Sequence, residues 1–141
     1  MALDLSAAFD TLDFSTILQR LQFTFGISGM ALDWVRTYLV GRTQYVKIGD
    51  TESGTTEARY GVPQGSCLGP FIFSLYVAPI INVISAHKDL MSHQYADDTQ
   101  LCIGITAVDH NDGSSLMSLD RCTSAVQEWF LQNGLCLNPT K

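Results

Sequence analysis

Positive charge is scarce in this chain of 141 residues. Eight lysines and arginines stand against fourteen aspartates and glutamates, which gives a net charge of −6. A protein that binds nucleic acid through its own surface normally carries an excess of basic residues that neutralise phosphates. The composition therefore argues against such binding, unless cations at a metal site attract the phosphates or the basic surface lies on other parts of a longer protein.

Several common binding signatures are also missing. The four cysteines are far apart and form no CxxC pair, and the three histidines lack zinc-ligand spacing. We therefore expect reduced, mostly buried thiols. Neither GxxxxGK[ST] nor GxGxxG occurs, and the surroundings of Ser66 do not match GxSxG, which excludes these phosphate-binding loops and argues against a nucleophilic serine.

Long hydrophobic runs are few. The most apolar stretch, Leu68–Ile84, is about 17 residues long and contains Pro70 and Pro79, so it favours a buried helix over a membrane span. Asp4 and Asp10 interrupt the apolar residues at the N-terminus, and no signal peptide is expected. With 46% hydrophobic and 16% charged residues, the chain is predicted to be one globular domain with its own core.

Apolar residues recur with helical and strand periods along the chain. The helical spacing predicts helices over about Phe14–Phe25, Gly29–Leu39 and Gly69–Ser85, and a last helix from Leu116 that ends near Gln132–Gly134. Strands are expected in Met1–Leu5, Gln44–Ile48 with the returning Glu57–Tyr60, on both sides of Asp97, and in Leu135–Leu137. The order βααββαββαβ predicts an α+β fold.

Particular residues predict where these elements begin and end. Asp13 is expected to cap the first helix and Gly26 to end it, and Ser28 to open the second. Pro79 implies a kink or a break in the apolar helix. Met1–Leu5 resembles the middle of a strand, because no turn or cap comes before it, which suggests that further chain normally precedes it.

The pair Asp97-Asp98 is the strongest candidate for chemistry. Strand-forming residues flank it on both sides, which predicts a tight hairpin with the carboxylates at its tip. Two like charges held close together are costly unless a cation compensates them, and Mg²⁺ prefers carboxylates together with phosphate oxygens and water. Asp4, in another apolar strand, is the natural third ligand. The alternative interpretation is a solvated acidic turn.

The loop Gly61–Pro70 is the second candidate. It has three glycines and two prolines and leads into the apolar helix. Flexible backbone beside a helix N-terminus favours contacts with anions or nucleotides, and Gln64 adds an amide that can donate and accept hydrogen bonds. The alternative is a tight structural turn. Phe9, by itself, is more often a core residue.

Four segments, in this order, resemble the palm of the reverse transcriptase domain of non-LTR (LINE-type) retrotransposons. Leu3–Asp13 resembles the first acidic motif of that family, and Gly61–Pro70 resembles its glycine loop. Tyr95–Leu101 matches the double-aspartate motif, and Asn133–Lys141 is similar to the final palm motif. The resemblance implies an α+β polymerase palm, with helices on one face of an antiparallel sheet that carries the acidic site.

The resemblance also implies roles for single residues. The catalytic metal carboxylates would be Asp4, Asp97 and Asp98. The nucleotide would lie against Leu5, Phe9, Gln64 and Gly65, with Phe9 excluding a ribose 2′-hydroxyl. Lys141 would donate to the leaving pyrophosphate. Two Mg²⁺ ions, or Mn²⁺, would assist attack of a primer 3′-hydroxyl on the α-phosphate of a dNTP.

The implied partners are an RNA template and a DNA primer, without a membrane. Family members carry basic fingers before the first motif and a thumb after the last, and neither fits within this sequence. The resemblance therefore implies a partial domain, residues 1–141, of a nuclear or cytoplasmic protein. Two alternatives remain: a catalytically silent remnant that acts at most as a binding module, and the palm of a group II intron-type enzyme.

Overall fold

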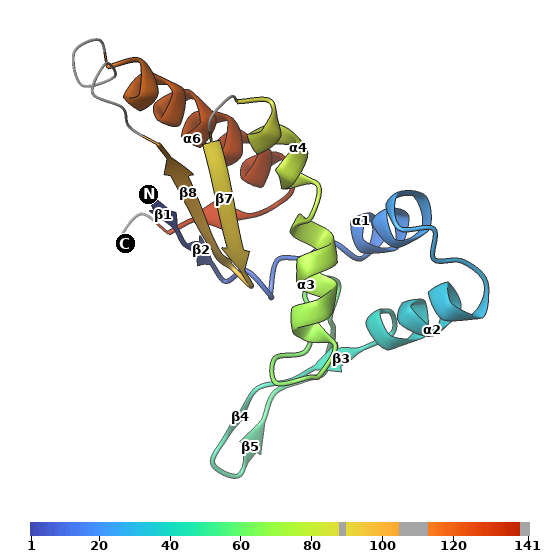
Figure 1. The fold of residues 1–141 in the computed structure, drawn as a ribbon. Coiled ribbons are helices and arrows are strands. Elements are labelled where there is room, and N and C mark those ends of the chain that lie inside the picture. The colour runs from blue at the N-terminus through green and yellow to red at the C-terminus, as the bar shows by residue number, and fades with distance from the viewer. Residues whose placement is uncertain (88–89, 105–112, 139–141) are drawn as a thin grey trace. The chain divides into compact units, whose positions relative to one another are not determined.

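The computed structural model describes residues 1–87, 90–104 and 113–138 (Figure 1). It has the expected mixture of helices and small antiparallel sheets. The chain divides into two compact units: the first comprises Met1–Ala8 and Val77–Lys141, and the second comprises Phe9–Tyr76.

The first unit is built on a three-stranded antiparallel sheet. Its strand order is β1 (Ala2–Leu3), β8 (Asp98–Ile103) and β7 (Leu90–Tyr95). A second small sheet pairs β2 (Leu5–Ser6) with β9 (Cys136–Leu137). Both sheets bring residues from the start of the chain beside residues more than 90 positions later.

Helices α4 (Ile80–Ser85) and α6 (Ser114–Gln132) pack against these strands. Side chains alternate along β8, with Thr99 and Leu101 buried and Asp98 and Gln100 exposed, because successive residues of a strand point to opposite faces. The core of this unit combines the buried face of β8 with the buried stripe of α6, formed by Cys122, Val126 and Phe130. The opposite face of β8 is left to polar side chains.

The second unit contains helices and an extended hairpin. The helical segments are α1 (Phe14–Gln19), the π-helical turn η1 (Arg20–Thr24), α2 (Met30–Leu39) and α3 (Gly69–Val77). The hairpin pairs β3 (Thr43–Gln44) with β6 (Thr56–Glu57), and β4 (Lys47–Ile48) with β5 (Thr51–Glu52). Figure 1 shows it as a long projection that ends in β4 and β5.

Three expectations need correction. The expected strand Gln44–Ile48 is not continuous, because two separate strands of two residues each, β3 and β4, take its place. All four of their residues are exposed, so the segment is not half-buried either. Gly29 rather than Ser28 precedes α2. Only Cys122 of the four cysteines is buried, and all four are free thiols; burial raises the pKa of the Cys122 thiol.

The break in the apolar helix is confirmed. The predicted helix is divided into α3 and α4, with Ala78 and Pro79 between them. Proline has no N–H to donate and cannot continue a helix without distortion, but it suits the position just before α4. Within the described ranges, no helix is long and apolar enough to cross a membrane.

The predicted cap at Asp13 is also confirmed and gives a test. Its Oδ1 atom accepts hydrogen bonds from the Thr16 backbone N–H (2.7 Å), the Thr16 hydroxyl (2.8 Å) and the Ser15 hydroxyl (2.5 Å). We expect Asp13→Ala to lower the free energy of unfolding by about 1 kcal/mol, and Asp13→Asn to lower it much less at neutral pH. Urea unfolding at pH 7 measures both variants.

The same cap has a defined pH dependence. Burial alone would raise the pKa of Asp13, but the hydrogen bonds from Ser15 and Thr16 outweigh it and hold the pKa below 3.8. A carboxyl group whose pKa is lowered by folding stabilises the fold at pH values above its unfolded-state pKa. That contribution disappears as the pH falls through the folded-state pKa. The advantage of wild type over Asp13→Ala should therefore be complete above about pH 4 and shrink only as the pH falls below it; an advantage that already shrinks well above pH 4 would contradict the charged cap.

Candidate functional site

The acidic hairpin forms as expected. Strands β7 and β8 pair so that Tyr95 lies opposite Asp98, which leaves Ala96 and Asp97 as the loop. Ala96 has a positive φ of 51°, the conformation that the first loop position of such tight hairpins requires. An L-residue there costs roughly 1–2 kcal/mol, so this tip is strained, and strained backbone of this kind often accompanies a functional site.

Asp4 lies between β1 and β2, two short strands that pair with different partner strands. Leu3 pairs with Thr99 of β8, whereas Leu5 pairs with Leu137 of β9. The first register ends with the pair Leu3–Thr99, and the next residues along these two strands are Asp4 and Asp98. The second register places Asp4 opposite Asn138, whose backbone N–H donates to the Asp4 carbonyl (2.8 Å) and whose side chain donates to Asp4 Oδ2 (3.0 Å).

This juxtaposition has an electrostatic consequence. Asp98 is exposed, and Asp4 and Asp97 are partly exposed. Like charges on neighbouring antiparallel strands repel each other, most strongly where they lie directly opposite. A bound cation would remove the repulsion. The hydroxyl of Thr99, next to Asp98, is buried and has no hydrogen-bond partner in the described part of the chain.

The donors of this edge fit a hard cation. Mg²⁺ takes one or two carboxylates and completes its shell with water and substrate phosphates, and Asp4 and Asp98 supply that minimum. No group of three His, Cys, Asp or Glu residues that could hold a metal ion occurs among the described residues. The structure thus does not bring the predicted ligands Asp4, Asp97 and Asp98 together as one three-carboxylate group.

Two backbone hydrogen bonds hold the glycine loop against the segment that follows Ala8. The Gly61 N–H donates to the Leu12 carbonyl (2.8 Å), and the Val62 N–H donates to the Phe9 carbonyl (2.9 Å). Gly61 has φ 79°, and a Cβ atom placed on it would lie 2.8–3.0 Å from backbone atoms of Asp10. Only glycine can adopt this positive φ and also fit this close to the Asp10 backbone. Gly61 therefore allows the loop to pack directly against the segment that contains Asp10.

Ser66 has a structural role in the same loop. Its hydroxyl donates to the Pro63 carbonyl (2.7 Å) and accepts from the Gly69 N–H (3.1 Å) at the beginning of α3. The Tyr38 hydroxyl donates to it as well (2.8 Å). With these three hydrogen bonds the Ser66 hydroxyl orders the start of α3.

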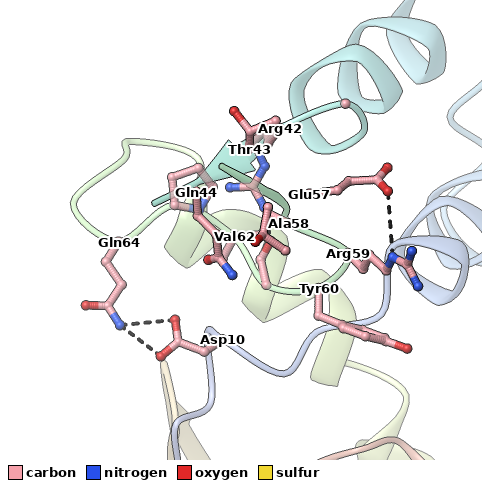
Figure 2. A pocket seen from close by; sticks show the side chains of 14 residues that line it. Asp10, Arg42, Thr43, Gln44, Glu57, Ala58, Arg59, Tyr60, Val62 and Gln64 are labelled. Atoms are coloured by element: carbon pink, nitrogen blue, oxygen red, sulfur yellow. Dashed lines mark hydrogen bonds and ion pairs between the residues drawn. The ribbon is translucent and has the colours of Figure 1, made fainter. Parts of the chain in front are cut away.

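Gln64 contacts a residue that the sequence did not single out as a partner. Its side-chain amide donates to both carboxylate oxygens of Asp10, at 3.2 and 3.1 Å (Figure 2). Both residues are exposed, as is Gly65. The carboxylate thus orients the amide and directs its nitrogen toward Asp10.

The other predicted residues lie in different environments. The Phe9 ring is partly exposed, and its centroid lies 4.9 Å from that of the buried Phe73, so Phe9 is partly a core residue. Leu5 is buried, with 5% of its surface exposed, and lies in β2 opposite Leu137 of β9. Lys141 lies outside the described residues.

A cavity of about 1040 Å³ in the second unit adjoins the Gln64–Asp10 pair. Its lining includes Arg42, Arg59 and Tyr60 from the base of the hairpin. Arg42 is committed to the fold, because it donates to the carbonyls of Leu39 and Gly61. The sequence did not lead us to predict this cavity. The only indication of it was that a hairpin with basic residues comes directly before the glycine loop.

Comparison with protein families and curated proteins gives consistent matches. A model of the family "Reverse transcriptase (RNA-dependent DNA polymerase)" matches residues 1–141. The chain is 32% identical over 142 residues to a putative 115 kDa protein in the type-1 retrotransposable element R1DM of Drosophila melanogaster, covering 98% of this chain and 12% of that protein. It is 27% identical over 143 residues to the RNA-directed DNA polymerase from mobile element jockey of Drosophila funebris, covering 99% and 15%.

Solved structures resemble the fold. Apo telomerase from Candida tropicalis, truncated from its C-terminal domain, matches with a TM-score of 0.72 and 13% identity over 99% of this chain and 29% of that one. Telomerase from Candida albicans, in complex with a TWJ fragment of telomeric RNA, matches with a TM-score of 0.67 and 12% identity over 99% and 26%. The chain thus spans a minor part of each of these four proteins.

Proposed function

Because the chain belongs to the reverse transcriptase (RNA-dependent DNA polymerase) family, we propose that it is the palm portion of an enzyme that copies RNA into DNA. The observation that supports this proposal is the pairing of Leu3 with Thr99, because Asp4 and Asp98 are the next residues along these two strands and Asp98 is one residue from the strained hairpin tip. Two aspartates on neighbouring strands, with Asp97 beside them, are what a cation-dependent phosphoryl-transfer site needs.

In this proposal the chain's residues hold and position the reactants. The carboxylates of Asp4, Asp97 and Asp98 would bind two divalent cations, Mg²⁺ or Mn²⁺, which supply charge neutralisation at the transferring phosphate. Asn138, which donates to Asp4 Oδ2 at 3.0 Å, fixes that carboxylate against rotation. The backbone of Leu5 follows directly and would contact the nucleotide.

The second unit would contribute to nucleotide selection. Phe9 is held against Phe73 and would exclude a ribose 2′-hydroxyl, which favours dNTPs. Gln64 is oriented by Asp10 and, with Gly65, would contact the incoming nucleotide and the template. Lys141 would assist the leaving pyrophosphate. An RNA template and a DNA primer complete the set of partners.

Primer extension on an RNA template tests this function. We expect this chain, or a version extended at both ends, to incorporate dNTPs only with a divalent cation present and to discriminate against rNTPs. Phe9→Val should relax that discrimination while it leaves dNTP incorporation largely unchanged. Incorporation that continues in EDTA, or that does not follow the template, would contradict the proposal, and RNA binding without incorporation would favour a silent binding module.

A further inference from the structure

Three side chains of metal-binding types lie on the acidic hairpin, away from its tip. Met91 and His93 belong to β7, and Cys102 belongs to the neighbouring strand β8 (Figure 1). All three residues are exposed, and Met91 has 68% of its surface exposed. The proposed polymerase chemistry uses none of them. Ions in solution can therefore reach a thiol, a thioether and an imidazole that have no assigned role.

The strand register places these side chains on one face of the sheet. Successive residues of a strand point to opposite faces, so Met91 and His93 share a face. Met91 pairs directly with Cys102, and His93 pairs with Gln100, the residue two positions before Cys102. Leu101 is buried on the other face. The thiol of Cys102 therefore lies on the open face, beside Met91.

The spacing on this face suits one shared ion. Directly opposite residues of an antiparallel pair have Cβ atoms about 5 Å apart, and diagonal neighbours are about 7–8 Å apart, which long side chains can span. Met91 and Cys102 form the direct pair, and His93 is the diagonal neighbour of Cys102. The methionine side chain is unbranched and flexible, so its sulfur can adjust to an ion that the other two side chains hold.

The ligand atoms select the kind of ion. Thiolate and thioether sulfur favour Cu(I), and imidazole also suits copper. Zn²⁺ instead takes Cys, His, Asp and Glu, usually in a set of about four, and no group of three of these residue types that could hold a metal occurs in the described part of the chain. Mg²⁺ needs oxygen ligands, which none of the three side chains supplies.

We propose that Met91, His93 and Cys102 bind one Cu(I) ion on the open face of the acidic hairpin. The sulfur atoms of Met91 and Cys102 and a ring nitrogen of His93 are its ligands. The site differs in chemistry from the proposed site for hard cations, which uses the carboxylate oxygens of Asp4 and Asp98. The inference therefore does not depend on the proposed function.

Anaerobic titration of the whole 141-residue chain with Cu(I), in competition with a chromogenic chelator, tests the site. Losing a residue that only orients a metal ligand already costs about 10–100-fold in affinity, so Cys102→Ser lowers the Cu(I) affinity at least tenfold. Cys136→Ser is the matched control, because Cys136 is an exposed thiol of the same unit that pairs with Ser6. This variant binds Cu(I) as wild type does.

Replacement of the other two ligands tests the shared ion. Met91→Leu keeps the apolar side chain but removes the sulfur, and it weakens Cu(I) binding, as does His93→Gln. Met117→Leu is the control for the methionine, because Met117 is 57% exposed on α6 of the same unit. All these side chains are exposed, so the urea midpoint of each variant stays close to that of wild type.

X-ray absorption at the copper edge gives a second measurement. Wild type shows both sulfur and nitrogen ligands, and His93→Gln loses the nitrogen contribution. The inference is overturned if Cys102→Ser and Cys136→Ser lose the same affinity, if Met91→Leu binds Cu(I) as wild type does, or if the ion has sulfur ligands alone. The titration contains no nucleotide or nucleic acid, so failure of primer extension counts against the proposed catalysis and not against this site.

Discussion

Replacing Gly61 by alanine is expected to destabilise the second unit by about 2–5 kcal/mol. The positive φ of 79° alone costs an L-residue roughly 1–2 kcal/mol. The new Cβ atom would also lie 2.8–3.0 Å from the carbonyl oxygen, Cα and carbonyl carbon of Asp10, and backbone atoms cannot move aside as a flexible side chain can. Overpacking of this kind adds about 1–3 kcal/mol.

Gly65→Ala is the matched control. Gly65 has nearly the same φ, 75°, but nothing lies within 4 Å of its added Cβ, so this variant should lose only the conformational part, about 1–2 kcal/mol. Each unit holds one of the two tryptophans, Trp34 in the second and Trp129 in the first. Urea unfolding followed by fluorescence in a Trp129→Phe background therefore reports on the second unit, and equal losses in both glycine variants would contradict the close approach to Asp10.

Asp98→Asn should abolish nucleotide incorporation while leaving the fold intact. A cation ligand is worth several kcal/mol of transition-state stabilisation, so we expect a loss of about 10²–10⁴-fold. The free energy of unfolding without cations should instead rise by about 0.2–1 kcal/mol, because the repulsion between Asp98 and Asp4 is removed. Loss of activity with a gain of stability separates a functional carboxylate from a structural one.

Asp120→Asn provides the control for this prediction. Asp120 is an exposed carboxylate on α6 in the same unit, and its replacement changes the net charge by the same amount. It should leave both incorporation and stability near their wild-type values. If Asp98→Asn behaves as Asp120→Asn does, the acidic hairpin is a solvated turn.

Residues that are close together in the sequence were sufficient to predict several elements of the structure. Asp13 caps α1 because its side chain reaches N–H and O–H groups only two and three residues away. The strands around Asp97 pair because strand formers flank a loop of minimal length, and Pro79 separates α3 from α4 through its own ring. In each case the residues that decide the structure are neighbours in the sequence.

Long-range contacts account for what the sequence did not predict. The first helix becomes the π-helical turn η1 at Arg20, whose guanidinium donates to the Tyr76 carbonyl and lies 4.4 Å from the centroid of its ring. The change of partner at Asp4 depends on strands more than 90 residues away. The cavity joins Asp10 to Arg59 and Gln64, a proximity to which no periodicity or spacing points.

We propose that Asp4 and Asp98 together bind a divalent cation that a nucleotide helps to hold. Titration of Mn²⁺ followed by electron paramagnetic resonance, with and without a dNTP, tests it most directly. We predict that the dNTP tightens Mn²⁺ binding by wild type and by Asp120→Asn, and that Asp4→Asn and Asp98→Asn each weaken it at least tenfold. Equal Mn²⁺ affinity in all four proteins would contradict the claim.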